Sequence, residues 1–193
     1  MYKDMVSMLN DAKEGDYEIK RFTVETGNLR AMIDGIIPGE YVSLKHRGEI
    51  LMSDTPMERR TNRQFVWNAY GDVLIGGLGI GMIVVAIQDN PVVKSITVIE
   101  KSEEVISLIT NQISFPEKIK IIQADVFTWK PENGQRFDCI YMDIWPYINR
   151  DVYQEEMKPL KRKYGHYLKP ISESPKRFNE CWAEWYAKNR RRL

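Results

Sequence analysis

The chain has 193 residues, of which 43% are apolar and 28% charged, so it is long enough for one well-filled core. Its formal net charge of +1 is typical neither of a nucleic-acid-binding polyelectrolyte nor of a protein with an acidic tail. No apolar run reaches the roughly 18 residues that span a bilayer, and the charged start is not typical of a secretory signal. We therefore expect no membrane partner, and we interpret the basic ending at residues 188–193 as a solvated helix end rather than a nucleic-acid contact.

Residues 1–54 are expected to form one helix and two small β-hairpins. The stretch 1–12 has the pattern of a short helix. Glycines and prolines then separate runs that are rich in strand-forming residues. The predicted strands of the hairpins lie at residues 17–24, 29–34, 41–47 and 49–53.

The clearest helix start in the sequence follows at Thr55. Thr55 can cap a helix, and Pro56 suits the first turn because its missing N–H costs no hydrogen bond there. Glu58 stands three residues after the cap, which completes a capping-box pattern. These residues predict a helix from residue 56 that Gly71 closes.

From residue 72 onward, short apolar runs alternate with helical patterns. A helix at residues 149–165 is expected to kink near Pro159. The alternation predicts an α/β fold over residues 55–193: a Rossmann-like, mostly parallel sheet with helices on both faces. The predicted strands lie at 72–76, 95–100, 118–123 and 136–143, and the earlier helices at 81–89 and 102–111.

The last segment predicts an aromatic helix after Ser174 and Pro175. Its stripe is interpreted as facing either the core or a second copy of the chain, and consists of Phe178, Cys181, Trp182, Trp185 and Tyr186. The two cysteines, Cys139 and Cys181, are far apart and set in apolar or helical patterns, which is typical of a reduced, cytoplasmic protein.

Four glycines follow the first strand of the predicted sheet, at Gly76, Gly77, Gly79 and Gly81. Glycine is costly inside a strand or helix, so this cluster indicates a backbone that bends sharply or approaches a ligand closely. In open parallel sheets, ligands bind beyond the carboxyl ends of the strands. The dinucleotide pattern G-x-G-x-x-G fails at Met82 and Val84, whereas G-x-G-x-G fits. This favours a nucleoside such as S-adenosylmethionine over a nicotinamide cofactor.

Acidic residues follow the next two strands. Glu100 stands 24 residues after Gly76, where a carboxylate can accept hydrogen bonds from ribose hydroxyls. Asp125 follows the third strand and can meet an adenine amino group, with Val126 or Phe127 near the ring. The competing interpretations are an exposed glutamate near a helix start and an aspartate that caps a helix.

The fourth strand carries an aspartate at each end. Asp138 opens it and is expected on the non-catalytic edge, whereas Asp143 ends it at the binding crevice. After Asp143 comes a proline turn with Trp145 and Tyr147, which would stack on a flat substrate or merely cover the sheet edge. Asp143 is the candidate catalytic residue.

With these pieces in order, residues 55–148 resemble a class I S-adenosylmethionine-dependent methyltransferase of the spermidine-synthase-like branch. The resemblance rests on VLIGGLGIG, VIEKSEEVI, QADVF and FDCIYMDIWP. It implies that Gly77 and Gly79 meet the methionine part of the cofactor, Glu100 the ribose hydroxyls and Asp125 the adenine amine. It places Asp143 beside the sulfonium, where this carboxylate would orient or deprotonate an amine.

The predicted cofactor-binding residues are Gly76, Gly77, Leu78, Gly79, Gly81, Glu100, Lys101, Asp125, Val126 and Asp143, and no metal is expected. Two departures from spermidine synthases weaken an aminopropyl-transfer interpretation: Gly79 replaces their aspartate, and no second acid precedes Pro146. Only 50 residues follow Asp143, so the C-terminal part is expected to be shortened, with residues 166–172 as its fifth strand.

The sequence thus favours an S-adenosylmethionine-dependent methyltransferase whose acceptor is a small molecule, either an amine or another nucleophile. Two alternatives stay open. One is a spermidine-synthase-like aminopropyltransferase, which would prefer the decarboxylated cofactor. The other is a non-catalytic nucleoside-binding or assembly module, which would bind the cofactor without turnover. A homodimer through the C-terminal aromatic helix is compatible with each.

Overall fold

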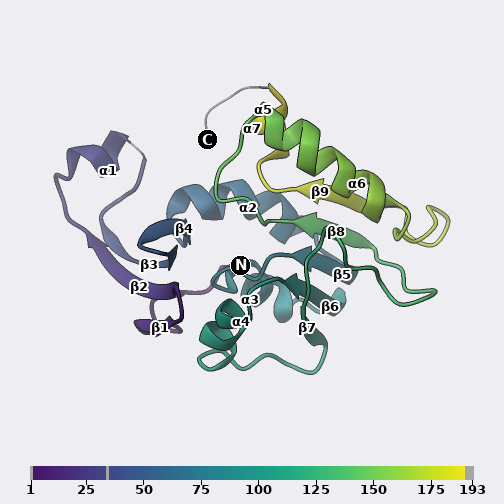
Figure 1. The fold of residues 1–193 in the computed structure, drawn as a ribbon, viewed down its shortest axis with the longest axis horizontal. Coiled ribbons are helices and arrows are strands. Elements are labelled where there is room, and N and C mark those ends of the chain that lie inside the picture. Colours follow the sequence, from purple (N-terminus) through teal and green to yellow (C-terminus); the bar gives the residue numbers. More distant parts are fainter. Residues whose placement is uncertain (1, 34, 190–193) are drawn as a thin grey trace.

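Two β-sheets organise the chain, and the computed structural model describes them within residues 2–33 and 35–189 (Figure 1). The larger sheet has five strands, all parallel, in the order β7-β6-β5-β8-β9. The strand order reverses beside β5, which lies between β6 and β8. Its strands are β5 (Gly71–Gly76), β6 (Val93–Glu100), β7 (Ile119–Gln123), β8 (Cys139–Met142) and β9 (Phe178–Cys181).

Helices cover both faces of this sheet, because successive side chains of a strand point to opposite sides. In β5, Val73 and Ile75 are buried in one core cluster, with residues of α2 (Pro56–Asn68), α3 (Met82–Gln88) and α4 (Glu103–Thr110). Leu74 is buried in a second cluster, with residues of α6 (Lys158–Gly165). This arrangement confirms the predicted Rossmann-like α/β fold.

The smaller sheet is antiparallel, with strand order β1-β2-β3-β4 (Figure 1). The prediction of the first hairpin, between residues 17–24 and 29–34, is wrong. Residues 29–33 form the helix α1 (Leu29–Ile33), because Asn28 Oδ1 accepts the Ala31 N–H and caps it. Residue 34 lies outside the described residues, and β2 pairs with β3 instead. The strands are β1 (Ala12–Glu14), β2 (Tyr17–Val24), β3 (Gly39–His46) and β4 (Glu49–Ser53).

The predicted helix near the start of the chain is also wrong, because residues 5–8 form a single turn. The guanidinium of Arg21 takes the carbonyls that a longer helix would use, since it donates to the Leu9 carbonyl at 2.7 Å and to the Val6 carbonyl at 2.6 Å. Met5 and Leu9 are fully buried in the larger core cluster. The segment is therefore held by side-chain contacts rather than by helical hydrogen bonds.

Helix α2 begins at Pro56 as predicted, but its cap differs from a capping box. The Thr55 side chain makes no cap bond and instead accepts a hydrogen bond from Ser53 Oγ at 3.0 Å. Glu58 does reach back, although to the Ser53 N–H rather than to Thr55. The helix ends at Asn68, and Gly71 opens β5 rather than closing α2.

The helix predicted near Pro159 is irregular, as expected. It consists of α5 (Arg150–Val152), a π-helical turn η1 (Tyr153–Met157) and α6. The Lys158 N–H donates to the Tyr153 carbonyl, five residues back. The wide turn stands directly before Pro159, which has no N–H of its own to continue a regular helix.

The predicted aromatic helix is wrong in its first half. Residues 178–181 form β9, the fifth parallel strand, because Cys139 to Met142 of β8 offer it a free edge. Residues 166–172, expected to be this strand, make only one isolated bridge, from Leu168 to Phe137. Only α7 (Glu184–Asn189) is helical, and residues 190–193 of the basic ending lie outside the described residues.

Both cysteines are buried and free of disulfides. Within residues 2–33 and 35–189, none of the helices combines the length and the apolar character that crossing a bilayer requires.

Candidate functional site

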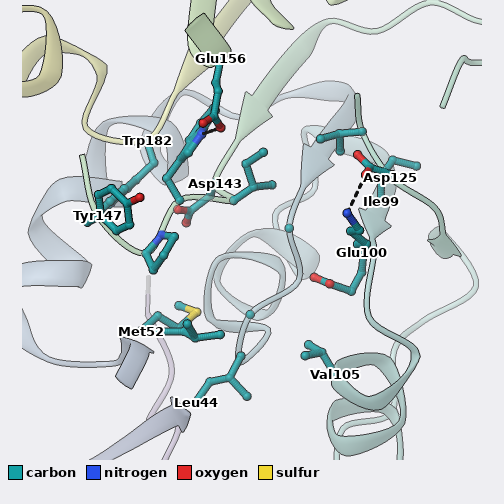
Figure 2. A pocket seen from close by; sticks show the side chains of 18 of the residues that line it. Leu44, Met52, Ile99, Glu100, Val105, Asp125, Asp143, Tyr147, Glu156 and Trp182 are labelled. Carbon is teal, nitrogen blue, oxygen red and sulfur yellow. Dashed lines mark hydrogen bonds and ion pairs between the residues drawn. The ribbon is translucent and has the colours of Figure 1, made fainter. Parts of the chain in front are cut away.

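A cavity of about 460 Å³ opens at the carboxyl ends of the parallel strands (Figure 2). It lies where the strand order reverses, the usual place for ligands in open α/β sheets. Three of the predicted residues lie outside its lining: Gly76, Leu78 and Gly81. The other seven line it: Gly77, Gly79, Glu100, Lys101, Asp125, Val126 and Asp143.

The glycine loop after β5 is pressed against its own chain as well as against the cavity. Gly77 has φ of +93°, and a Cβ there would collide with the Asp143 carbonyl oxygen. Gly79 has φ of +52°, and a Cβ there would collide with the thioether sulfur of Met52. Both positions favour glycine for their backbone conformation, and Gly77 also requires it for space, because its close neighbour is backbone. The loop therefore presents its main chain to the cavity.

The three predicted residues outside the cavity lining support the loop. Gly76 ends β5 with its Cα close to the Met142 side chain. The Leu78 side chain is buried, and its N–H donates to Glu100 Oε2 at 2.8 Å. Gly81 has φ of +75° and precedes α3.

Glu100 is fixed at the end of β6 by two backbone groups. Its Oε2 accepts the Leu78 N–H, and its Oε1 accepts the Ser102 N–H at 2.9 Å. Each carboxylate oxygen has two acceptor sites, so each retains one for a ligand hydroxyl. This geometry suits a carboxylate that accepts hydrogen bonds from the two hydroxyls of a ribose.

Asp125 lies on the same side of the cavity as Glu100, across from Asp143 (Figure 2). Its Oδ2 forms an ion pair with Lys101 Nζ at 2.9 Å, and its Oδ1 accepts the Phe127 N–H at 2.9 Å. The hydrogen bond from Lys101 is the main reason why the pKa of Asp125 lies below its ordinary value. Asp125 is therefore a carboxylate at neutral pH and can accept a hydrogen bond from an amino group. Its ion pair also neutralises Lys101.

Asp143 stands at the end of β8, where its N–H donates to the Gly76 carbonyl at 2.7 Å. Burial raises the pKa of its carboxyl to about 7, and a hydrogen bond from the Asn62 side chain opposes this rise. Asn62 is fully buried on α2, and its Oδ1 accepts a hydrogen bond from the Tyr141 hydroxyl at 2.8 Å. Asp143 can thus exchange a proton near neutral pH. Asp138, as expected, lies at the other end of the strand, paired with Lys169 at 2.7 Å.

Glu58 is a residue of the cavity that the sequence analysis missed, since it interpreted this glutamate as part of a capping box. Burial and, to a lesser extent, the nearby charge of Asp143 raise its pKa to about 8, and the hydrogen bond from the Ser53 N–H opposes this rise. One sequence signal was available. Glu58, Asn62 and Phe65 recur at helical spacing, which places two polar side chains on the buried face of α2.

Aromatic side chains form much of the remaining wall near Asp143 (Figure 2). Trp145 Nε1 donates to Glu156 Oε2 at 2.7 Å, and Trp182 Nε1 donates to Thr61 Oγ1 at 3.0 Å, so both indole rings are fixed. Tyr147 is 65% exposed. The antiparallel sheet adds an apolar part of the wall: Tyr17, Leu44, Leu51 and Met52.

The lining is strongly acidic. Lys101 is the single basic residue among the described residues of the wall, and Asp125 neutralises it. Five carboxyl groups face the same cavity, from Glu58, Glu100, Asp125, Asp143 and Glu156. A cavity with this balance favours ligands that carry positive charge.

No protein-family model matches the sequence, and no curated protein matches it. Solved structures with a similar fold include the N-methyltransferase NodS from Bradyrhizobium japonicum WM9, at 22% identity and a TM-score of 0.45 over 61% of this chain and 65% of that chain. NodS has also been solved with S-adenosyl-L-homocysteine. A putative caffeoyl-CoA O-methyltransferase from Staphylococcus aureus aligns at 16% identity and a TM-score of 0.46 over 72% and 58%.

The CcbJ methyltransferase from Streptomyces caelestis aligns at 14% identity and a TM-score of 0.46, over 58% of this chain and 46% of that chain. The chain thus spans less than two thirds of the length of each of these three solved proteins. All three are methyltransferases, and nothing in these similarities points to the spermidine-synthase-like branch. The Rossmann-like fold itself is assigned from the strand order of this chain.

Proposed function

We propose that the protein is an S-adenosylmethionine-dependent methyltransferase that acts on a small acceptor. The observation that carries the proposal is the placement of a glycine loop, Glu100 and Asp125 around one cavity that also contains Asp143. Glu100 would accept hydrogen bonds from the ribose, and Asp125 from the adenine amine. The main chain at Gly77 and Gly79 would lie against the methionine part.

When bound, S-adenosylmethionine supplies a methyl group on a positively charged sulfur. The residues of the chain would hold the acceptor in line with that group, because positioning alone can contribute several kcal/mol to such a substitution. Asp143 would orient the acceptor and exchange its proton. The acidic lining supports an amine as the acceptor, since an ammonium group is attracted to a cavity with a surplus of carboxyls.

Aminopropyl transfer from decarboxylated S-adenosylmethionine is the second candidate. Two observations favour it. The first is that Lys101 is engaged by Asp125, so no free basic side chain of the described wall stands ready for a cofactor carboxylate. Glu58 also supplies a second acid near Asp143, which the sequence lacks at the expected position before Pro146. A nucleoside-binding module without turnover is the remaining alternative.

Calorimetric titration, together with chemical unfolding in the presence of each ligand, tests the cofactor. We expect S-adenosylmethionine to bind the wild-type protein and to raise the free energy of unfolding by roughly 2.7 kcal/mol at a hundredfold excess over its dissociation constant. Glu100→Ala should lose this effect, because the ribose hydroxyls lose their acceptor. Glu103→Ala, three residues further along and in the first turn of α4, is the matched control.

The other ligands separate the alternatives. Preference for the decarboxylated cofactor supports aminopropyl transfer, and binding without turnover of any amine supports the non-catalytic module. Equal binding to wild type and Glu100→Ala contradicts the proposed cofactor geometry. Tight binding of NAD in place of S-adenosylmethionine contradicts the choice of cofactor.

A further inference from the structure

Glu58 and Asp143 reach the same cavity from two different elements, the first turn of α2 and the end of β8. We propose that Glu58 is the second carboxyl of the acceptor site, where it and Asp143 together bind a cationic amine and receive the proton that the amine loses. This inference rests on the proposed function. It adds a specificity-determining residue to the cavity and assigns the chemical class of the acceptor.

Neither carboxyl has a basic partner among the described residues. Glu58 is only 7% exposed and is bonded to the Ser53 N–H, while Asp143 is bonded to the neutral side chain of Asn62. The nearest arginine on α2, Arg59, is engaged in an ion pair with the fully buried carboxylate of Asp54 at 2.9 Å. Both residues line the cavity and neither carboxyl is neutralised by an ion pair among the described residues, so an external cation in the cavity would find two uncompensated acids.

The other groups around the pair leave its acidic character intact. The Tyr2 hydroxyl is buried without a hydrogen-bond partner among the described residues, and burial and the Asp143 charge raise its pKa. The charges of Arg59 and Arg63 act in the opposite direction and lower that pKa. Burial and Asp143 also raise the pKa of Tyr141. Both phenols are thus neutral hydrogen-bond donors near neutral pH.

Proximity of two carboxyls disfavours the simultaneous ionisation of both, so the pair titrates in two coupled steps. A bound ammonium group reverses this preference, because its charge stabilises both carboxylates. Binding of a cation should therefore release protons and should strengthen as the pH rises through the range of about 7 to 8 in which Asp143 and Glu58 titrate.

The aromatic wall indicates that the cation is organic. In Figure 2, Tyr147 and Trp182 lie on the same side of the cavity as Asp143. Aromatic faces attract ammonium groups and cover the alkyl chain that follows them. Within the described parts of the chain, no group of three acidic, histidine or cysteine side chains is placed to hold a metal ion. The pair is thus better suited to an alkylammonium than to a divalent metal.

Methyl transfer to an amine balances in protons and electrons when this pair of carboxyls accepts the proton. The ammonium form of the acceptor first gives one proton to a carboxylate of the pair, which leaves a neutral amine with a free electron pair. The nitrogen then forms a bond to the methyl carbon while the carbon–sulfur bond breaks, and the bonding electrons stay on sulfur. The products are a methylated ammonium ion and neutral S-adenosylhomocysteine. The protonated carboxyl then returns its proton to water.

The test compares wild type, Glu58→Gln and Glu180→Gln. Glu180 is a matched control because burial also raises its pKa, although it lies on β9 outside the cavity lining. Each protein is saturated with S-adenosylhomocysteine and titrated calorimetrically with n-butylamine, and with butan-1-ol as the uncharged probe. Wild type and Glu180→Gln should bind butylammonium at pH 8.5 at least tenfold more tightly than at pH 6. Glu58→Gln should bind it at least tenfold more weakly at pH 8.5.

The readouts separate the two proposals. Failure of S-adenosylhomocysteine to bind wild type contradicts the proposed function and, with it, the acceptor site. If S-adenosylhomocysteine binds, three results for butylammonium refute the acceptor site alone. These are no binding to wild type, equally tight binding to wild type and Glu58→Gln, and binding no tighter than that of butan-1-ol. Binding of Mg²⁺ that excludes butylammonium also overturns it. If Glu58→Gln fails to fold, Glu58→Asp is tested in its place. This variant keeps the charge and should retain part of the amine affinity.

Discussion

At the scale of single residues, the site shows how position in the fold decides what a carboxyl group does. Glu100 and Asp125 are bonded to backbone N–H groups, and Asp125 also has a basic partner, so they suit hydrogen-bond acceptance. Glu58 is buried and Asp143 half-buried, both without a basic partner among the described residues, and desolvation raises their pKa values to about 8 and about 7. The same chemical group thus serves two purposes in one cavity.

The raised pKa of Glu58 predicts a pH dependence of stability. Its pKa is about 8 in the folded protein and about 4.5 ordinarily, so the folded state binds more protons between these values. The free energy of unfolding of wild type should therefore fall as the pH rises from about 5 to 8.5. Glu58→Gln has no such charge to bury. It should be more stable than wild type at pH 8.5 by about 2 kcal/mol, with a smaller difference at pH 5.

Urea unfolding at the two pH values measures this difference. Glu103→Gln, on the first turn of α4, is the control and should follow the wild-type curve. A gap between wild type and Glu58→Gln that stays constant from pH 5 to 8.5 would contradict the raised pKa.

At the scale of elements, the parallel sheet and the antiparallel sheet meet at the glycine loop. Met52, at the fourth position of β4, packs directly against Gly79 after β5. The loop therefore lies between two sheets rather than at the edge of one. Its shape depends on packing as well as on its own sequence.

Gly79→Ala should test this contact, with Gly134→Ala as the matched control. Both glycines have positive φ, but a Cβ at Gly134 meets nothing within 4 Å. Both substitutions should cost about 1–2 kcal/mol of backbone strain, and Gly79→Ala should cost about 0.5–1 kcal/mol more, because the flexible Met52 side chain must turn away. Combination with Met52→Ala should recover this excess, as chemical denaturation of the four variants would show. Equal costs for the two glycines would refute the contact.

The Trp182 side chain links two other elements, because it follows β9 and donates a hydrogen bond to Thr61 of α2. Trp182 is 3% exposed, whereas Trp185 in the next helix is 60% exposed. Trp182→Ala should lower the free energy of unfolding by about 3–5 kcal/mol, and Trp185→Ala should change it by at most about 0.5 kcal/mol. Thermal unfolding checks both. A larger loss for Trp185→Ala that depends on protein concentration would instead support the predicted homodimer.

At the scale of the whole molecule, the strand ends could be predicted and the pairings between distant segments could not. Glu100, Asp125 and Asp143 were located because each stands at or just after the end of an apolar strand, and parallel strands end at one edge. Glu58 was missed because its burial depends on how α2 packs on the sheet. The strand at residues 178–181 was missed because a short, half-polar run is stabilised mainly by the open edge of β8.

The helix prediction for the start of the chain was wrong for a related reason. Its helical spacing was real, since Met5 and Leu9 are both buried, but Arg21 from a distant strand takes the carbonyls. Likewise, the cap provided by Asn28 turned an expected strand into α1. Local patterns therefore predicted the burial of these residues more reliably than their backbone conformation.

The contribution of the antiparallel sheet to the cavity wall has a consequence for how such a protein diversifies. The residues proposed to hold the nucleoside belong to the parallel sheet, whereas Leu44, Leu51 and Met52 come from a separate hairpin. Met52 also packs on the glycine loop, so changes at Leu44 and Leu51 are the ones that can reshape the cavity wall without disturbing that loop. Exchange of these two side chains between proteins of this architecture is thus a route to alter acceptor preference while the glycine loop keeps its packing.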